Sequence, residues 1–343
     1  MKLLTANCRV FQRRRIKMFN NPKNQAGIAL FLVLWVLTLL SVIVGEFCHA
    51  MRTEVNITRN FKEMTQAYYI SAAGLNTAIS QVIANRGKPY GSPSEDSETD
   101  ETIRWRVNAE IPPIAFAQGQ FTVRIDNESG KINLNTAGNE LLTLMLEGFE
   151  LDDTDKNVIV DSILDWRDKD DLHRINGAEN EYYLSLSNPY HCKNGDFDSI
   201  GELLLVRGMS PEIFYGGLKE RVTVYSEDTS EKEVQSKINI NAAAPALLRA
   251  LPGMTEDLVQ NLTEYRKQAD ITSMNDLIEI LGTETYTAVH RFLMLEYCSY
   301  FTITSTGSMK DSSINQGVQA LIKLDVQEDN KYKILQWVDR ISK

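Results

Sequence analysis

The longest apolar segment covers residues 26–45, and no charged residue lies between Lys23 and Glu46. About 20 apolar residues are enough for a helix that crosses a bilayer. Apolar residues then recur at spacings of three and four, with no proline before Pro89. They are Phe61, Met64, Tyr68, Ala72, Leu75, Ile79 and Val82. The pattern predicts one helix of roughly 55–60 residues, first in the membrane and then packed on a sheet.

The residues before this helix are basic and include no acid. Lysine and arginine stand at Lys2, Arg9, Arg13, Arg14, Arg15, Lys17 and Lys23. The positive-inside rule predicts a cytoplasmic N-terminus and a single-pass protein whose body lies outside the cytoplasm. A secretory signal peptide is the alternative, but such signals have a shorter apolar core of ~7–15 residues and a small-x-small cleavage pattern. Met1 and Met18 are both compatible with the start of translation.

Alternation of polar and apolar residues predicts strands in two groups that lie far apart in the sequence. One group covers residues 103–110 and 120–126, and the other covers 300–305, 318–326 and 332–338. Such alternation is typical of antiparallel strands with one buried face. If both groups form one sheet, everything between them is an insertion. The sequence therefore predicts an α+β fold in which a long helix packs on a small antiparallel sheet.

The predicted insertion contains an internal repeat. Residues 131–137 are followed by Leu141 and Leu142, and residues 237–243 are followed by leucines at the same offset. Each copy begins as a short strand, after which Asn135 or Asn241 is placed to cap a helix. Both copies are typical of helix-hairpin-helix or SAM-like units, so a membrane-anchored DNA-binding protein of the competence type is the alternative function. Acids in 147–153 and 253–257 occupy the ground where a phosphate would bind, which favours a packing or protein-docking module.

Charge and cysteine content narrow the choice of ligands. The formal charge of the chain is −10 although its first residues are basic, so the exported body is acidic and favours divalent cations or basic partners over nucleic acid. Cys8, Cys48, Cys192 and Cys298 show no CxxC spacing, which argues against zinc. Cys192 and Cys298 either pair in an oxidising compartment or remain thiols. No catalytic motif occurs, and the histidines lie far apart, so the sequence predicts no enzyme.

Acids gather between the two copies of the repeat. They occur in residues 165–171 and again in 176–183, on a turn and a neighbouring loop. Several carboxylate oxygens that converge in this way suit calcium, although the spacing is not that of an EF-hand. The alternative is a solvated acidic loop in which Asp165 caps a helix.

The junction of the basic leader and the apolar helix resembles a type IV pilin-like precursor. In that superfamily the leader is cut after a glycine, which here is Gly27, and Ile28 becomes the first mature residue. Most members carry glutamate at the fifth mature position, where this chain has Leu32. The minor pseudopilin K of the type II secretion system is known for lacking that acid. A carboxylate in lipid needs a partner such as a neighbouring subunit's amine, so a subunit without one need not follow any other and is suited to the tip of a fibre.

The remaining motifs resemble the same minor pseudopilin K family over nearly the whole chain from Gly27. They are residues 130–137, 165–166, 177–179, 182–183, 188–190, 199–208 and 238–241. The resemblance implies a pilin-like fold with a large helical domain inserted in its sheet, and calcium in that domain. The candidate calcium ligands are Asp165, Asp168, Asp170, Asp171, Glu179 and Glu181.

The resemblance also implies the partners and the location of the protein. The implied partners are the minor pseudopilins I and J at the pseudopilus tip, the prepilin peptidase, the inner-membrane assembly platform and lipid, but not nucleic acid. The implied location is the inner membrane with a periplasmic body. A plain anchored periplasmic scaffold, whose Gly27 is never cut, is a further alternative. The expected segments are a leader (1–27), a transmembrane half-helix (28–48), a periplasmic helix with the first strands (49–130), two helical parts (131–236 and 237–293) and the closing strands (294–343).

Overall fold

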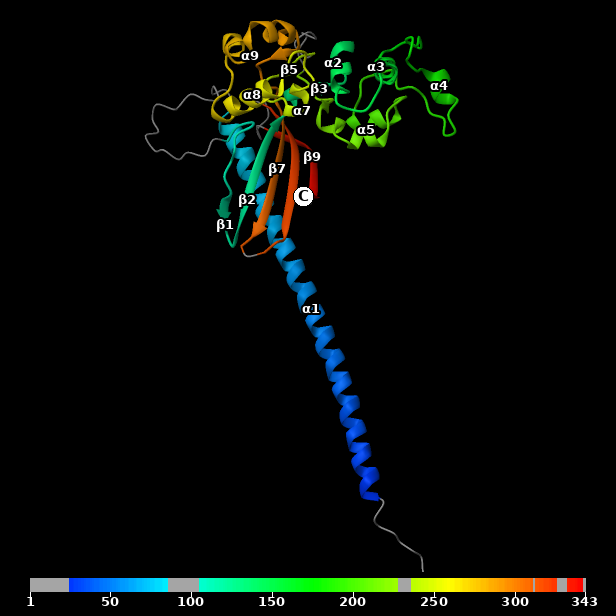
Figure 1. The fold of residues 1–343 in the computed structure, drawn as a ribbon, viewed down its shortest axis with the longest axis vertical. Coiled ribbons are helices and arrows are strands. Elements are labelled where there is room, and N and C mark those ends of the chain that lie inside the picture. Colours follow the sequence, from blue (N-terminus) through cyan, green and yellow to red (C-terminus); the bar gives the residue numbers. More distant parts are fainter. Residues whose placement is uncertain (1–24, 86–104, 228–235, 311, 326–331, 342–343) are drawn as a thin grey trace, which may run out of the picture. The chain divides into compact units, whose positions relative to one another are not determined.

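The computed structural model describes residues 25–85, 105–227, 236–310, 312–325 and 332–341. The chain divides into two units, residues 1–61 and residues 62–343. Helix α1 (Gln25–Ala84) has 60 residues, which confirms the predicted long helix, and its first part is exposed and apolar enough to cross a membrane (Figure 1). The expected leader, up to residue 24, lies outside the described residues.

The second unit contains a five-stranded antiparallel sheet. Its strands are β1 (Ile114–Phe116), β2 (Gly119–Asn127), β7 (Tyr300–Met309), β8 (Asn315–Leu324) and β9 (Tyr332–Ile341). Their order in the sheet is β1-β2-β7-β8-β9. The central pair joins β2 to β7 over nine residues, from Gly119 opposite Met309 to Asn127 opposite Phe301. Strands from the two distant groups therefore form one sheet, as the sequence predicts.

One predicted strand is wrong. Residues 103–104 lie outside the described part, and Trp105 to Ala109 form a bend and a turn instead of a strand. Trp105, Arg106 and Val107 are all buried, so the polarity of Arg106 does not place it on a solvated face. Its guanidinium nitrogen Nη1 lies 2.8 Å from the buried carboxylate of Asp270. The alternation predicts that Arg106 is exposed, but the side chain is buried because it forms an ion pair with Asp270.

Helix α1 packs on the sheet through residues 67–82, where small side chains allow a close approach. Ala67, Ile70, Ser71 and Gly74 are buried, whereas Phe61 and Met64 of the predicted face are exposed. A Cβ at Gly307 of β7 would overlap the backbone of Ala67 and Ser71, and a Cβ at Gly74 would overlap the ring of Phe121. Leu75, Ile79 and Val82 of the predicted face are buried as expected, so the prediction fails at Phe61 and Met64, and the contact also uses the small residues beside that face.

The insertion lies between β2 and β7 and has a hydrophobic core of its own. Its first part contains η2 (Glu128–Gly130), β3 (Ile132–Asn133), α2 (Asn139–Met145), α3 (Asp153–Arg167), α4 (Asn180–Leu184), η3 (Ile200–Leu205), α5 (Pro211–Tyr215), η4 (Leu218–Glu220) and β4 (Val222–Thr223). Its second part contains β5 (Ile238–Asn239), α7 (Pro245–Leu248), α8 (Glu256–Gln268), α9 (Met274–Val289), η5 (His290–Phe292) and β6 (Leu293–Met294). Strands β3 and β4 pair in parallel, as do β5 and β6.

The repeat extends to hydrogen bonds, but its asparagines do not cap helices. The Asn135 side chain donates to the carbonyl of Phe197 at 3.0 Å and accepts from its N–H at 2.7 Å. Asn241 makes the same pair of bonds with Ile271. The cap positions of α2 and α7 are instead Gly138 and Ala244, neither of which donates or accepts a side-chain bond there. The predicted caps are therefore wrong, because each amide instead bonds the backbone of a distant loop.

A second repeated contact was not evident from the spacing of the motifs. Arg167 of α3 donates to the carbonyls of Leu134 and Ala137. Arg266 of α8, which is almost fully buried, donates to the equivalent carbonyls of Ile240 and Ala243. In each copy an arginine of the following helix satisfies the turn after the short strand, where backbone carbonyls would otherwise lack donors.

Candidate functional site

The predicted acidic site begins at the C-terminal end of α3. Asp165 lies inside this helix with no exposed surface, so it is not a cap, and the C-cap is Asp168. Nη1 of Arg174 lies 2.5 Å from the Asp165 carboxylate and 2.6 Å from that of Asp168. The N–H of Arg174 also donates to Asp165. A Cβ at Gly177 would overlap the Asp165 carboxylate, so this position needs glycine.

Glu179 is the buried centre of this region. Its side chain is 4% exposed, and neither carboxylate oxygen has a nitrogen or hydroxyl donor among the described residues. The pKa of Glu179 is raised to about 7: burial is the main cause, the nearby Cys192 thiol lowers the pKa, and the charges of Asp165, Asp168 and Asp171 raise it. Oδ1 of Asp168 and Oδ1 of Asn194 are likewise buried without a donor. The region therefore holds several unpartnered oxygens, the ligand type that calcium prefers.

The other predicted ligands occupy the rim. Asp171 accepts hydrogen bonds from the side chains of Asn180 at 2.8 Å and Asn194 at 3.0 Å. Asp170 is exposed and accepts from the backbone N–H of Leu172. Glu181 is exposed on α4. Asn194 was missed from the sequence, although the Asn-Gly pair that it begins is a turn signal, and its φ of 49° confirms a left-handed residue.

Arg174 joins Asp165 and Asp168, and the charges of Asp165, Asp168 and Asp171 act on the nearby Glu179. In the described part of the chain, no three Asp, Glu, His or Cys side chains converge closely enough to hold a metal ion. The unpartnered oxygens come from two carboxylates and one amide. This donor set fits a hard cation that accepts mixed oxygen ligands, and it does not fit zinc.

The second helical hairpin is poorly suited to bind a phosphate. Thr255 caps α8 by accepting from the N–H of Leu258, and the first turn of α8 contains Glu256 and Asp257. Arg249 is paired with Glu256, with Nε and Oε2 2.6 Å apart. The nearby cation and the helix N-terminus are thus both engaged by protein groups. This agrees with the sequence argument against DNA binding.

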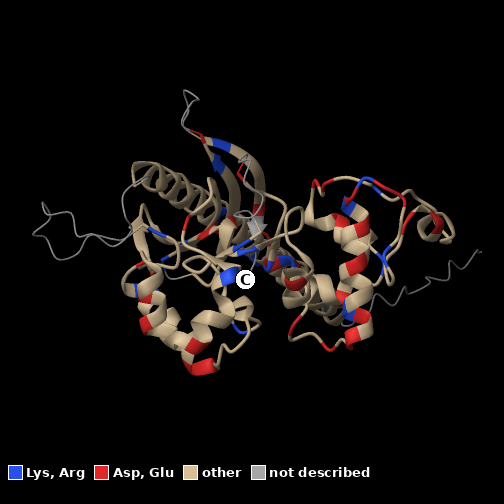
Figure 2. Cartoon of the chain, turned by 90° about the horizontal axis from the view of Figure 1, so that it is seen from above, with Lys and Arg blue, Asp and Glu red and all other residues tan. Residues whose placement is uncertain are grey.

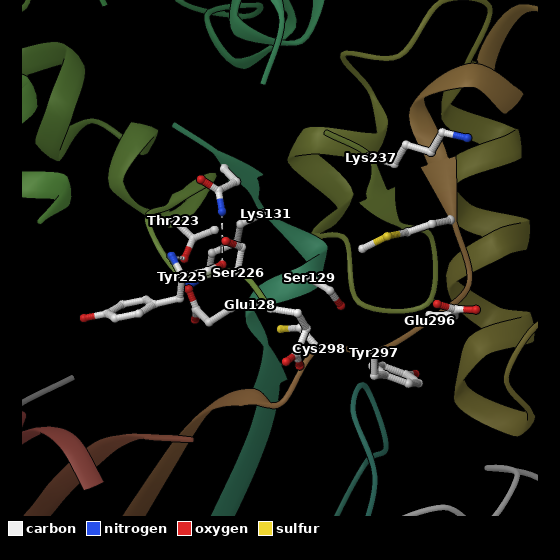
Figure 3. A pocket seen from close by; sticks show the side chains of 13 residues that line it. Glu128, Ser129, Lys131, Thr223, Tyr225, Ser226, Lys237, Glu296, Tyr297 and Cys298 are labelled. Carbon is white, nitrogen blue, oxygen red and sulfur yellow. Dashed lines mark hydrogen bonds and ion pairs between the residues drawn. The ribbon is translucent and has the colours of Figure 1, made fainter. Parts of the chain in front are cut away.

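A cavity of about 110 Å³ lies where the insertion joins the sheet (Figure 3). Its lining comes from η2 and β3, from the end of β4 and the segment after it, from the residue before β5, and from the end of β6 and the segment after it. The lining residues are Glu128, Ser129, Lys131, Asn133, Thr223, Tyr225, Ser226, Glu227, Lys237, Met294, Glu296, Tyr297 and Cys298. Burial raises the pKa of the Cys298 thiol to about 12, and its sulfur lies 3.3 Å from Oδ1 of Asn127. Cys192 and Cys298 are both free thiols, so the structure supports the unpaired alternative.

The processing residues lie at the start of α1. Gly27 is the third residue of the helix, and Ile28 and Leu32 are both exposed on it. Leu32 stands in an unbroken apolar surface, with Phe31 and Val33 beside it and equally accessible. A leucine at this position is compatible with lipid, which a lone carboxylate is not.

Known proteins resemble both the sequence and the fold. The model of the family "Type II secretion system (T2SS), protein K" matches residues 124–227, and a helix-hairpin-helix motif matches residues 233–294. Type II secretion system protein K of Aeromonas hydrophila is 27% identical over 67% of this chain and 71% of its own length. The corresponding protein of Klebsiella pneumoniae is 27% identical, over 66% of this chain and 70% of its own. Its putative counterpart in Escherichia coli K12 is 22% identical over 87% and 93%.

The fold is shared with a solved structure. A chain in the crystal structure of the GspK–GspI–GspJ complex from the type 2 secretion system of enterotoxigenic E. coli superimposes with a TM-score of 0.55 at 19% identity. The match covers 83% of this chain and 99% of the other.

A long apolar N-terminal helix that packs on an antiparallel sheet defines a pilin-like protein, and the helical insertion between β2 and β7 distinguishes a subclass. The insertion carries the match to the protein K family. The chain is similar to type II secretion system protein K in sequence and fold, and these comparisons support the function of a minor pseudopilin of that system.

Proposed function

We propose that this minor pseudopilin assembles with the minor pseudopilins I and J at the tip of the periplasmic pseudopilus. The observation that carries the proposal is the helical insertion of residues 131–293, which enters and leaves the sheet at neighbouring ends of β2 and β7. This bulky domain is suited to end a fibre rather than to be covered by the next subunit. The relative found in a GspK–GspI–GspJ complex supports the choice of partners. The role is structural rather than catalytic.

Co-expression tests the proposed assembly. The chain should co-purify with the I and J pseudopilins of its own bacterium as a discrete complex, and its loss should abolish secretion. Retention of the full complex by a chain that lacks its pilin-like sheet would contradict the proposal. Binding of duplex DNA at physiological salt, measured by gel shift, would instead favour the alternative of a DNA receptor.

Processing and tip placement follow from the start of α1. We expect the prepilin peptidase to cut after Gly27, so that Ile28 becomes the methylated N-terminus in the inner membrane, where the assembly platform acts. Mass spectrometry of the membrane-extracted protein checks this, and an intact leader contradicts it.

Leu32→Glu restores the acid that allows a subunit to follow another, and we expect it to displace the protein from the tip. Unchanged secretion and an unchanged tip position would show that the missing acid does not specify the tip.

We propose that the acidic region binds calcium through Glu179, Asp168, Asp171 and the Asn194 amide oxygen. The support is the set of buried oxygens without donors, which a hard cation would satisfy. Calcium supplies positive charge that offsets the cost of burying Glu179. Asp165 holds Arg174, while Asp170 and Glu181 lie at the rim.

Calorimetric titration of calcium into chelator-treated protein tests this site. Glu179→Gln should weaken binding by at least about tenfold, because it removes a buried charged ligand. Glu181→Gln is the matched control: it makes the same chemical change two residues away on an exposed side chain. Equal affinities for the two variants would contradict the assignment.

A further inference from the structure

Two large apolar side chains project into solvent from the loop that follows α3. Leu172 is 79% exposed and Ile175 is 97% exposed, more than the other large apolar side chains described outside α1. We refer to Leu172 and Ile175 as the apolar pair. Single exposed apolar residues are common on protein surfaces. Two that are this accessible, three residues apart on one loop, require an explanation.

Hydrogen bonds on both sides of the pair fix the loop. The N–H of Leu172 donates to Asp170 at 2.9 Å, and the N–H of Arg174 donates to Asp165 at 3.1 Å. The backbone N–H and the side chain of Asn176 both donate to Asp161 of α3, at 3.1 and 3.0 Å.

A tight turn then sets the direction of Ile175. The N–H of Gly177 donates to the carbonyl of Arg174 at 3.1 Å, which places Ile175 at the corner of that turn. The residues on either side of Ile175 are bonded inward to α3. The exposure of Ile175 is therefore imposed by the ordered backbone and is not the result of a loose segment.

The surroundings of the pair are acidic. Among residues 168–181 the exposed charged side chains are the acids Asp170, Asp171 and Glu181 and the cation Lys169, and Figure 2 shows Asp and Glu along the helices of this part of the insertion. A second copy of the chain would bring like charges together, and so would an anionic membrane surface. A recess in a protein, apolar at its floor and bordered by lysine and arginine, complements both the pair and its charge.

We propose that the apolar pair is a docking site for a protein partner that presents such a basic-rimmed apolar recess. This inference goes beyond the tip complex with the I and J pseudopilins. The conformation of the loop does not depend on calcium, because Arg174 and Asn176 fix it through protein groups. Burying one such aliphatic side chain changes an equilibrium constant by about 10- to 100-fold. The pair therefore supplies the central contact of an interface whose charges steer association.

Site-specific photo-crosslinking in the producing bacterium tests the proposal. A photoreactive amino acid at position 175 of the full chain should give a discrete protein adduct. The same amino acid at position 215 is the matched control, because Tyr215 is also an exposed apolar residue, 62% accessible, on the separate helix α5. The crosslinked peptide should map to an apolar recess bordered by lysine or arginine.

The identified partner then allows binding to be measured. The double variant Leu172→Ser, Ile175→Ser should bind at least about tenfold more weakly, and raising salt from about 50 to 300 mM should weaken binding of the unsubstituted chain. The I and J complex of the double variant should be unchanged, which separates this test from that of the tip assembly. No adduct beyond the control, an adduct to pseudopilin I or J, or an adduct to a neutral or acidic surface would overturn the proposal. So would Leu172- and Ile175-dependent flotation with phosphatidylglycerol vesicles, which would assign the pair to a membrane instead.

Discussion

At the scale of single residues, burial and glycine placement decide how the acidic region is built. Gly177 allows the loop to pass next to the Asp165 carboxylate, and Arg174 then compensates that buried charge. The cost of burial is left uncompensated at Glu179, where the pKa is raised to about 7. The sequence identifies the acids and glycines of this region. It does not predict which acids have partners, because the partners are brought close only in the folded chain.

The glycine at position 177 should be intolerant of substitution. Gly177→Ala places a methyl group against the Asp165 carboxylate, and we expect a loss of about 2 kcal/mol or more in the free energy of unfolding, measured in urea with a chelator. Gly195→Ala is the control, since its Cβ would meet a single atom, the Lys193 carbonyl oxygen, at an ordinary 3.8 Å. Equal stability of the two variants would contradict the close contact.

Glu179 should make stability depend on pH. Its carboxyl has a pKa of about 7 in the folded chain, against an ordinary glutamate value of 4.5. Between these values the folded state binds more protons than the unfolded state, so this residue lowers the free energy of unfolding as the pH rises from 4.5 to about 7. In the Glu179→Gln variant the free energy of unfolding should fall less over this pH range, because the glutamine does not titrate. Parallel stability curves for the two proteins in the presence of a chelator would show that Glu179 is not responsible.

At the scale of elements, the repeat carries information that a strand or helix assignment does not contain. The short strands of both copies were predicted, but Asn135 and Asn241 were expected at helix caps. Each instead makes two bonds to the backbone of a distant loop. An asparagine that caps a helix and an asparagine that bridges to a distant loop can both follow the same short strand. The local sequence pattern therefore does not distinguish these two roles.

Removal of either bridging asparagine should destabilise its own copy of the repeat. Asn135→Ala or Asn241→Ala leaves a backbone N–H and a carbonyl without their partners, and we expect a loss of about 1–3 kcal/mol in the free energy of unfolding. Asn139→Ala, at an exposed position at the start of α2, should change stability by less than about 0.5 kcal/mol. Denaturant unfolding followed by fluorescence measures both. A similar effect of all three substitutions would contradict the bridging role.

The strands show the same limit of prediction. The structure confirms strands at residues 120–126 and at the three C-terminal segments. One face of β2, β7 and β8 is buried in the core shared with α1, whereas Ile334 and Leu335 of β9 are both exposed. Residues 105–109 alternate too, but Arg106 is buried against Asp270, 164 residues away. Phe61 and Met64 continue the helical period of α1 but are exposed, whereas Leu75, Ile79 and Val82 of the same period are buried against the sheet. Periodicity identified the elements, whereas long-range partners decided which faces are buried.

At the scale of the whole molecule, the topology makes the insertion separable from the sheet. Asn127 and Phe301, which flank the insertion, lie opposite each other in the antiparallel β2–β7 pair. The insertion also has its own core, distinct from the core formed by α1 and the sheet. The two distant groups of strands predicted this organisation, because they form one sheet only around an insertion, and the resemblance of the motifs implied the same.

Excision of the insertion should therefore leave a folded pilin-like domain. A chain in which residues 131–297 are replaced by a short glycine-serine loop should keep the β2–β7 pair, and Arg106, whose partner Asp270 is removed with the insertion, should become solvated. Circular dichroism and cooperative thermal unfolding of the domain from residue 62 onward measure this. Loss of the β-sheet signal would show that the insertion is needed to form the sheet. Secretion by the excised full-length chain would count against the proposed role at the tip.

The bare contact between the end of α1 and strand β7 has a mechanical consequence. At Gly307 no side chain separates the helix from the sheet, because a Cβ there would overlap the backbone of Ala67 and Ser71, so there is little compressible material between them. If a fibre grew by adding subunits at its base, the helix of its first subunit would be pushed. Thrust delivered to residues 67–71 would then pass almost directly into the strand that follows the helical head, and a bulkier residue at Gly307 would force the two apart.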